Sequence, residues 1–408
     1  MLLGIRIQNY RYLTHMTVGM TAEDVSHHRE DPLAAFSAGL TPVFPLANLT
    51  AFVGKNDTGK SVFMDALSFL SDTLRHGCRS SSTMSGRTGF SVIASHPEKP
   101  VSFSLLFSMP LYLDGNTTKC YISYDLRIEG DRNGRPFISH ESVKYCPMPT
   151  DGHPADPKSF RDVLVLENGV GKVIFDGSER KAGVADSLFT GVSAYGSLLD
   201  CPILTALYQE ITHWFFCHFS HNGSHGRNEN QAVAPGAHRH LNPMGSNAKN
   251  VLKYIEKEDP ERYQRLVQKI KEKIPTVSHK GGLPDFFKES PNKLFLYLLL
   301  LEDAKPNPLV FMETPSEGLY HDMVDVLAVE FREYVLHHPQ SQLFFTTHNP
   351  YILESLAPDE VWVFHRDDTR EHSASAHCVA TSPIVSKMYE QGVGMGAIWY
   401  AGHFEDEA

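Results

Sequence analysis

Gly54-Lys-Asn-Asp-Thr-Gly-Lys-Ser61 fits the phosphate-binding pattern GxxxxGK[ST] at every position. The largely apolar run just before it, residues 49–53, is typical of a buried strand. After the glycine loop, apolar side chains recur with a helical period at Phe63, Ala66, Leu67 and Leu70. A glycine loop between a strand and a helix is the context in which this pattern binds phosphate, and a chance glycine turn is the alternative.

The residue types of this loop suit a nucleoside triphosphate with a divalent cation. Gly54 and Gly59 let the backbone curl and point N–H groups at phosphate oxygens, and the start of the helix adds a positive dipole. Lys60 is expected to reach the β- and γ-phosphates, and the Ser61 hydroxyl to hold Mg²⁺. We therefore predict ATP and Mg²⁺ as cofactors. The expected binding residues are Gly54, Lys55, Asn56, Asp57, Thr58, Gly59, Lys60, Ser61 and Val62.

The composition indicates a folded, acidic protein. Its 408 residues allow one large domain or two ordinary ones, and 41% hydrophobic against 21% charged residues is typical of a globular chain. A net charge of -11 argues against a protein built to coat DNA, although a local groove could still bind nucleic acid. The 6 cysteines form no CxxC pair, which indicates reduced thiols and a cytoplasmic protein. We expect no signal peptide, because residues 1–10 carry only a short apolar run with a charge inside it. We also expect no membrane contact, because the longest apolar run, residues 294–301, is far shorter than the ~20 residues that span a bilayer.

Short apolar runs in the first half predict strands. Residues 2–7 alternate apolar and polar, which suggests an edge strand, and residues 75–100 are rich in Ser, Gly, Arg and Pro, which suggests a loop. Further strand-like runs lie at residues 101–107, 120–128, 164–167 and 172–175. Together they predict an antiparallel sheet between the phosphate loop and the middle of the chain.

The following part of the chain predicts helices and a loop rich in histidine. Residues 197–217 look helical, residues 251–273 read as a charged helix pair broken at Pro260, and residues 294–301 as a buried helix. The crowded histidines are His213, His218, His221, His225, His238 and His240. A metal site needs defined spacing and a closed shell, and no HxxxH or HExxH lies on a predicted helix, so a polar surface loop is favoured over a metal site.

A second apolar run ends in a carboxylate. Pro308-Leu-Val-Phe-Met-Glu313 has the Walker B pattern, in which a strand beside the phosphate loop delivers an acid to Mg²⁺. Glu313 is therefore expected to hold the metal with Ser61, directly or through water. The helix expected next covers residues 323–335.

A third apolar run, Gln342-Leu-Phe-Phe-Thr-Thr-His348, ends in a histidine. A histidine at a strand end near a nucleotide can contact the γ-phosphate, and a hydrogen-bonded loop histidine is the alternative. The two motifs before it favour the switch role. The candidate catalytic residues are therefore Lys60, Glu313 and His348, together with the nearby acid Glu317.

These segments together resemble a known family. Asn9-Tyr-Arg11, the phosphate loop, Phe311-Met-Glu-Thr-Pro-Ser-Glu-Gly-Leu319 and Phe345-Thr-Thr-His-Asn-Pro-Tyr351 are similar to the AAA-family ATPases of the ABC/SMC-head type, in the predicted-ATPase group related to RecF and OLD-family proteins. The resemblance implies an α/β P-loop head, in which helices flank a mixed β-sheet, with an antiparallel β subdomain and a helical insertion. It also implies ATP-driven dimerisation.

The resemblance covers nearly the whole chain, so residues 1–408 are expected to form a single ATPase head. Its expected parts are an N-terminal Walker A lobe (1–75), a β-rich insertion (76–195), a helical and loop insertion (196–290) and a C-terminal lobe with the Walker B strand and the switch histidine (291–408).

Two departures from the family pattern bear on activity. Such ATPases usually carry a second acid, the general base, where this chain has Thr314, whose hydroxyl cannot usefully accept a proton at neutral pH. The signature region reads Lys288-Glu-Ser-Pro-Asn-Lys293 and lacks glycine, although Ser290 and Asn292 could still cap a phosphate. The composite site of a dimer is therefore left open.

Three functions follow from these expectations. The first is a slowly hydrolysing ATPase that regulates a separate effector, encoded nearby, in antiphage defence or DNA maintenance; this role comes from the resemblance. The second is an OLD-like nuclease, which would need a Toprim domain with a glutamate and an Asp-x-Asp pair, and the residues after Val363 show no such pair in a strand context. The third is a nucleotide-loaded scaffold without turnover, which the threonine at position 314 keeps open.

Overall fold

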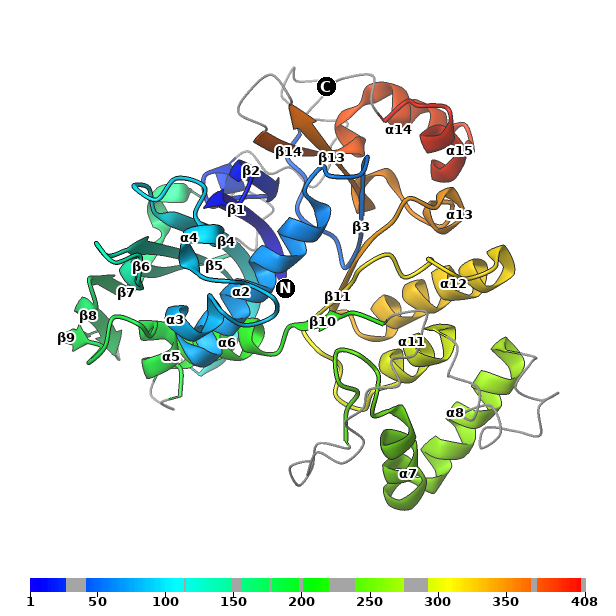
Figure 1. Cartoon of the computed structure of the whole chain (residues 1–408), viewed down its shortest axis with the longest axis horizontal. Helices are drawn as coiled ribbons and strands as arrows, with labels where there is room; N and C mark the ends of the chain where they lie inside the picture. Colours follow the sequence, from blue (N-terminus) through cyan, green and yellow to red (C-terminus); the bar gives the residue numbers. More distant parts are fainter. Residues whose placement is uncertain are drawn as a thin grey trace.

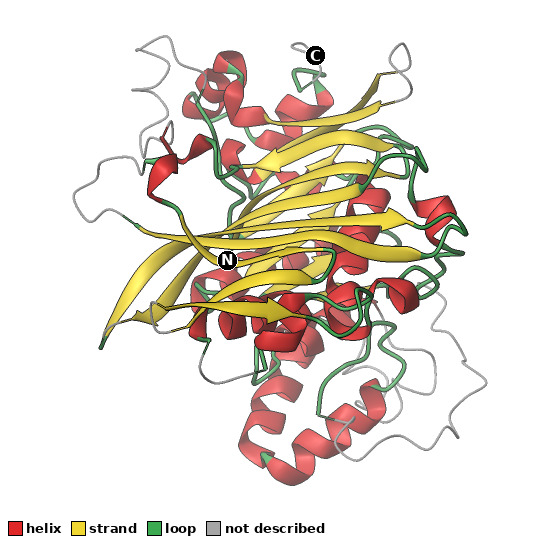
Figure 2. Cartoon of the chain, turned by 90° about the vertical axis from the view of Figure 1, so that its left-hand side faces the viewer, coloured by secondary structure: helices red, strands yellow, loops and turns green. Residues whose placement is uncertain are grey.

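The computed structural model describes residues 1–26, 42–113, 115–148, 156–175, 178–197, 201–219, 239–274, 293–367 and 373–404. Two sheets lie side by side, with the helix α2 (Lys60–His76) between them and further helices on the far face of the second sheet (Figures 1 and 2). This is the mixed α/β architecture that the sequence predicts.

The first sheet is antiparallel and has the strand order β2-β1-β4-β5-β6-β7-β8-β9. Its strands are β1 Leu2–Tyr10, β2 Leu13–Gly19, β4 Val101–Leu113, β5 Asn116–Gly130, β6 Pro136–Pro147, β7 Arg161–Glu167, β8 Val170–Phe175 and β9 Ser178–Gly183. The prediction of an edge strand at residues 2–7 is wrong, because β1 pairs with both β2 and β4. Alternation reports which side chains face the core, and it does not report how many neighbours a strand has.

The second sheet carries the phosphate loop. Its strand order is β10-β11-β12-β3-β13-β14, and all strands are parallel except the last. Its strands are β3 Leu49–Val53, β10 Phe215–Cys217, β11 Leu309–Met312, β12 Gln342–Thr346, β13 Val361–Asp367 and β14 Ser373–Cys378. Every residue of β3, β11 and β12 is buried, as expected for parallel strands covered on both faces.

The face of the second sheet that meets α2 is aromatic. Phe52 of β3 packs against Phe63 of α2 and against the rings of Phe311 and Phe344, with ring centroids 5.2–5.5 Å apart. These residues belong to one core that also includes the apolar side chains of the antiparallel sheet. The buried aromatic layer therefore fixes the helix that begins at the phosphate loop against both sheets.

The opposite face of the second sheet is covered by helices of the C-terminal half. Ala51 and Val53 of β3 point to this side, since successive strand residues face opposite ways. The helices of this half are α7 Ala248–Glu258, α8 Pro260–Lys273, α11 Lys293–Leu301, α12 His321–His337, α13 Pro350–Leu353, α14 Pro383–Glu390 and α15 Met395–Tyr400. They confirm the helix pair broken at Pro260, the buried helix at 294–301 and the helix at 323–335. No helix in the described ranges is long and apolar enough to cross a bilayer.

A buried glutamine joins the two sheets. The Gln342 side chain at the start of β12 accepts a hydrogen bond from Leu2 N (2.6 Å) and donates to Leu2 O (2.9 Å). The side chain is fully buried. It thus couples the first residue of β1, and with it the antiparallel sheet, to the second sheet.

Two other predictions need correction. The loop expected at 75–100 contains the short helices α3 Cys78–Ser81 and α4 Phe90–Ile93. The helix expected at 197–217 is α6 Pro202–Thr212, which follows α5 Gly191–Tyr195 and is followed by β10. Three consecutive residues are enough for a buried strand but too few for a period to be recognised. The signature region 288–292 and His221, His225 and His238 lie outside the described residues.

A buried arginine holds α2 from the side. The Arg87 guanidinium is fully buried and donates to Asp72 Oδ2 (2.7 Å) and Asp65 Oδ1 (3.2 Å), both on α2. Asp65 also accepts from Tyr10 OH at 2.7 Å. Because these charges are paired and hydrogen-bonded, they hold the helix in register with β1.

Candidate functional site

The phosphate loop begins where β3 ends, at the carboxyl edge of the parallel sheet. Gly54 (φ 137°) and Gly59 (φ 110°) adopt backbone conformations that favour glycine, and α2 starts at Lys60. A Cβ atom on Gly54 would lie 2.3 Å from Phe364 O of the neighbouring strand β13. Glycine is therefore required at this position by space as well as by φ.

The amine of Lys60 points into the loop. Its Nζ donates to Gly54 O (2.8 Å) and Lys55 O (2.6 Å), and the residue is only 7% exposed. Burial lowers the pKa of Lys60 to about 8, and the nearby charge of Asp57 opposes this shift. The loop thus holds the Lys60 ammonium on neutral carbonyl oxygens, and the ammonium can exchange these partners for phosphate oxygens.

Ser61 and Glu313 meet although 252 positions separate them in the sequence. Ser61 Oγ donates a hydrogen bond to Glu313 Oε1. The nearby His218 imidazole and the hydrogen bond from Ser61 hold the pKa of Glu313 below its usual value, against the effect of partial burial, so its ionised form is favoured. A hydroxyl and a carboxylate oxygen are the hard ligands that Mg²⁺ prefers, so the two side chains fit the expected metal.

His218, which the sequence analysis assigned to a polar surface loop, lies beside Glu313 at the site. It follows β10, and its Nδ1 lies 3.8 Å from Glu313 Oε2. β10 pairs in parallel with β11, with Cys217 opposite Met312, so the residues after both strands come together at the carboxyl edge of the sheet. A polar residue directly after the apolar run 214–217 repeats the Walker B pattern, and that signal could have found it.

His348 lies on the same edge, after β12. Partial burial lowers the pKa of His348, and the positive charge of Lys60 adds to this shift. The structure therefore brings the histidine within electrostatic reach of the phosphate-loop lysine. Strand order explains the arrangement, because β12 lies between β11 and β3.

The turn after Glu313 has an unusual backbone. Thr314 has φ 41°, a conformation rare for a β-branched residue, and its N–H donates to Thr346 Oγ1 (3.0 Å). Its hydroxyl donates to Glu317 Oε2 (3.2 Å), while the Glu317 side chain is exposed. The second candidate acid thus lies beside Thr314.

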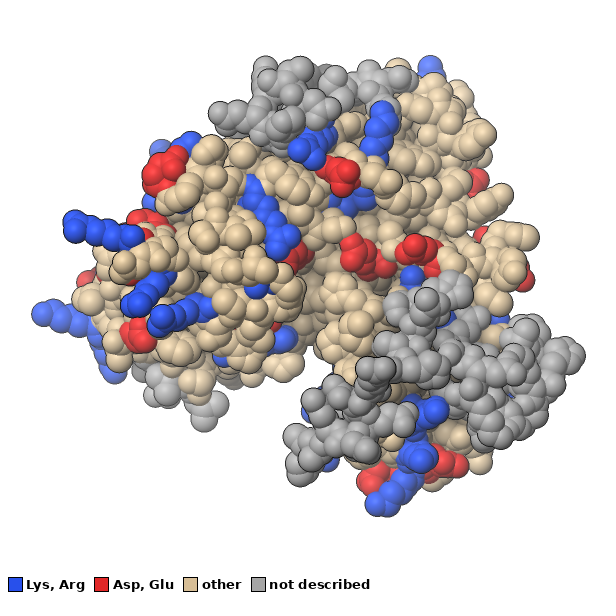
Figure 3. Space-filling model, in the orientation of Figure 1, with Lys and Arg blue, Asp and Glu red and all other residues tan. Residues whose placement is uncertain are grey.

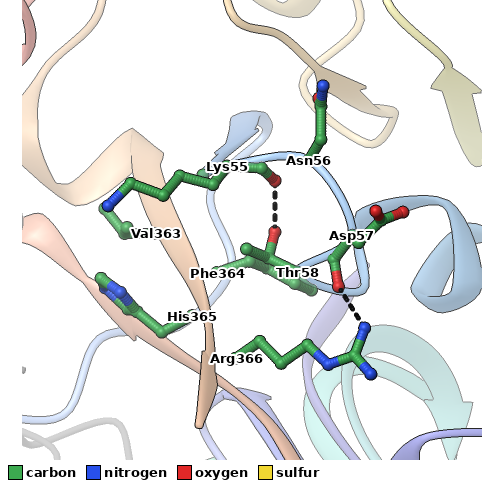
Figure 4. A pocket seen from close by; sticks show the side chains of 9 residues that line it. Lys55, Asn56, Asp57, Thr58, Val363, Phe364, His365 and Arg366 are labelled. Carbon is green, nitrogen blue, oxygen red and sulfur yellow. Dashed lines mark hydrogen bonds between the residues drawn. The ribbon is translucent and has the colours of Figure 1, made fainter. Parts of the chain in front are cut away.

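A cavity of about 290 Å³ adjoins the outer side of the phosphate loop (Figure 4). Residues 54–58 and 363–366 line it. Arg366 Nη1 donates to Asp57 O (3.4 Å), and its guanidinium lies 5.2 Å from the ring centroid of Tyr12. The cavity therefore extends the loop with a cationic group, the Arg366 guanidinium, which also stacks on Tyr12.

Among known proteins, one family model matches the part of the chain that carries Glu313 and His348. A family model described as "AAA domain, putative AbiEii toxin, Type IV TA system" matches residues 292–354, which contain the Walker B strand and His348. No curated protein matches the chain.

Several solved structures are similar to the chain. The SMC head domain from Thermotoga maritima is 12% identical with a TM-score of 0.38, over 92% of this chain and 98% of that chain. The SMC head bound to the C-winged helix domain of ScpA is 13% identical with a TM-score of 0.41, over 92% and 97%. The SMC head with an extended coiled coil, bound to the C-terminal domain of ScpA derived from Pyrococcus furiosus, is 11% identical with a TM-score of 0.41, over 96% and 98%.

The fold and the site define a class of protein. A glycine loop at the carboxyl edge of a buried parallel sheet, facing the acid of a Walker B strand, is a P-loop nucleotide-binding domain. The mixed α/β fold, the order of the motifs and the AAA-domain match over residues 292–354 are similar to those of P-loop ATPases of the ABC/SMC-head type.

Proposed function

We propose that this chain binds ATP with Mg²⁺, hydrolyses it slowly, and uses its nucleotide state to regulate a separate effector protein. The observation that carries the proposal is the contact between Ser61 Oγ and Glu313 Oε1. It brings the end of the phosphate loop and the end of the Walker B strand to one point, where both oxygens can face the same cation. The pKa of Glu313 is lowered, which favours its charged form.

Each residue has a distinct role in this proposal. Lys60 neutralises phosphate charge, the N–H groups of the loop fix the phosphate oxygens, and Ser61 with Glu313 holds the cation. Mg²⁺ held by these two side chains would supply positive charge against the charge that develops during phosphoryl transfer. His348 faces the same region and is the candidate contact for the γ-phosphate.

Slow turnover follows from the residue after Glu313. Thr314 cannot serve as a general base at neutral pH, and a positioned base contributes about 10²- to 10⁴-fold in rate. Positioning and charge remain, so residual hydrolysis is expected. The same residue supports the second candidate, a nucleotide-loaded scaffold without turnover.

The rate of phosphate release separates these two candidates. We expect purified protein to release phosphate from ATP at less than about 1 s⁻¹, which is below the range of most enzymes. Glu313→Gln should abolish this rate, because the amide is a poorer ligand for the cation. Turnover at several per second would contradict the missing-base account, and ATP binding with no release at all would favour the scaffold.

The proposed partners are a second copy of the chain and an effector. The matched family model names a toxin of a toxin–antitoxin system, which supports a role in antiphage defence. DNA maintenance is the alternative setting. Nucleic acid remains a possible ligand, but on the face in Figure 3 the described Lys and Arg side chains are interspersed with Asp and Glu, which does not favour it.

ATP should drive self-association. We expect a monomer without nucleotide and a two-fold dimer with ATP. Sedimentation velocity with and without ATP measures this. A monomer under both conditions would count against the dimer and leave the nucleotide site unaffected.

A further inference from the structure

A buried lysine forms hydrogen bonds to the turn that follows Glu313. Lys293 is the first residue of α11, and its side chain is only 8% exposed. Its Nζ donates to Thr314 O (3.1 Å) and Glu317 O (3.4 Å), so one ammonium bridges both ends of the turn after the Walker B strand. From the other side, Thr346 Oγ1 accepts the N–H of Thr314.

Anchoring α11 does not require this lysine. All nine residues of α11 are buried, and those after Lys293 pack into the apolar core beneath the second sheet. Burying an ammonium costs several kcal/mol, and among the residues that the structure describes it donates to neutral carbonyl oxygens rather than forming a close ion pair with a carboxylate. Such an arrangement is a poor source of stability.

The lysine instead stabilises a backbone conformation that is unfavourable by itself. Thr314 has φ 41°, and conformations of this kind persist only where the surroundings hold them. Glu313, whose carboxylate contacts Ser61, directly precedes this strained residue. Burial lowers the pKa of Lys293, while the charges of Glu317 and Glu313 oppose the shift, so the ammonium is coupled to both acids.

We propose that Lys293 is a positioning residue of the nucleotide site, which fixes the turn from Thr314 to Glu317 and thereby aims Glu313 at the cation next to Ser61. This inference rests on the proposed function, because it assumes that Glu313 holds Mg²⁺. It gives a role to Lys293, the last residue of the signature region, to which the sequence alone assigned none. A partner of a metal ligand typically contributes about 10- to 100-fold in metal affinity or activity.

The test compares Lys293→Met, Lys293→Arg and Lys269→Met. Lys269 forms close ion pairs with Glu302 (2.7 Å) and with Glu330 (2.6 Å), whose side chain is only 1% exposed, and it serves as the matched control lysine. For each variant, ATP affinity is measured by calorimetry with and without Mg²⁺, together with phosphate release and the thermal midpoint.

We expect Lys293→Met to bind ATP with wild-type affinity in the absence of Mg²⁺. The increase in ATP affinity that Mg²⁺ causes should be about 10- to 100-fold smaller than in the wild type, and kcat should fall by a similar factor. Its thermal midpoint should change little, since loss of two carbonyl hydrogen bonds and removal of a buried charge act in opposite directions. Lys293→Arg should restore part of the Mg²⁺ effect. Lys269→Met should show the reverse pattern, with a lower midpoint and an unchanged Mg²⁺ effect.

An unchanged Mg²⁺ effect in Lys293→Met would overturn the inference. If Lys293→Met does not fold, Thr346→Val loosens the same turn from the other side, and an unchanged Mg²⁺ effect there would overturn it equally. Failure of the proposed function is a different result, because the wild-type protein itself would then bind no ATP or gain nothing from Mg²⁺.

Discussion

Lys60→Ala is expected to abolish nucleotide binding at working concentrations. The amine of Lys60 lies inside the phosphate loop and forms hydrogen bonds to two of its carbonyl groups, so it is already placed where phosphate oxygens must enter. Removing one partner of a buried charge pair costs about 2–5 kcal/mol, which corresponds to about 30- to 5,000-fold in affinity. Calorimetric titration with ATP measures the loss.

Lys55→Ala is the matched control for this experiment. Lys55 lies in the same loop, but its side chain is exposed, and its carbonyl, which the substitution keeps, accepts the bond from Lys60. Its affinity for ATP should change far less. Equal losses in the two variants would show that general positive charge, rather than the buried amine, binds the phosphates.

The pKa of Lys60 gives the same prediction a pH signature. In the free loop the pKa is about 8, and bound phosphate favours the charged amine and raises it. Affinity for ATP should therefore be constant below about pH 8 and fall as the pH rises above it, because the amine must take up a proton to bind. Lys60→Ala should lack this fall.

Thr314→Glu is expected to speed hydrolysis. It introduces a carboxylate directly after Glu313, where related ATPases carry their general base, and such a group is worth about 10²- to 10⁴-fold in rate. The new residue must adopt φ 41°, and it gives up the hydrogen bond from Thr314 Oγ1 to Glu317, so the gain should lie at the lower end. Phosphate release under saturating ATP measures it.

Thr314→Gln controls for size and for the lost hydrogen bond without adding a base. Its rate should stay at or below that of the wild type. If Thr314→Gln hydrolyses ATP faster than the wild type, the faster hydrolysis of Thr314→Glu comes from loosening of the turn rather than from proton transfer. If Glu317→Gln alone removes the wild-type rate, the base is Glu317, and the assignment of a missing base at position 314 must be given up.

The sequence predicts those parts of the site that depend on local chemistry. The loop 54–61 and the acid Glu313 follow from residue types that must stand at fixed offsets around a strand end. Parallel pairing then brings such strand ends to one edge, so the approach of Ser61 and Glu313 could be foreseen. His348 is predicted by the same reasoning.

The remaining features depend on packing that no local pattern encodes. His218 follows a strand of three residues that the sequence shows as the end of a helical segment. Lys293 is hidden because its partners, the carbonyls of Thr314 and Glu317, come from a turn that only tertiary packing brings to α11. Likewise, the place of β1 inside its sheet depends on distant strands, and Gln342 shows its role only once both sheets are assembled.

The most direct test of the account is a calorimetric titration of the wild-type protein with ATP, in the presence and absence of Mg²⁺. We predict one nucleotide bound per chain, with affinity that Mg²⁺ strengthens in the wild type but not in Glu313→Gln. Binding that is absent, or that is equally strong in both proteins with and without Mg²⁺, would contradict the assignment of Ser61 and Glu313 as the cation site of a phosphate-binding loop.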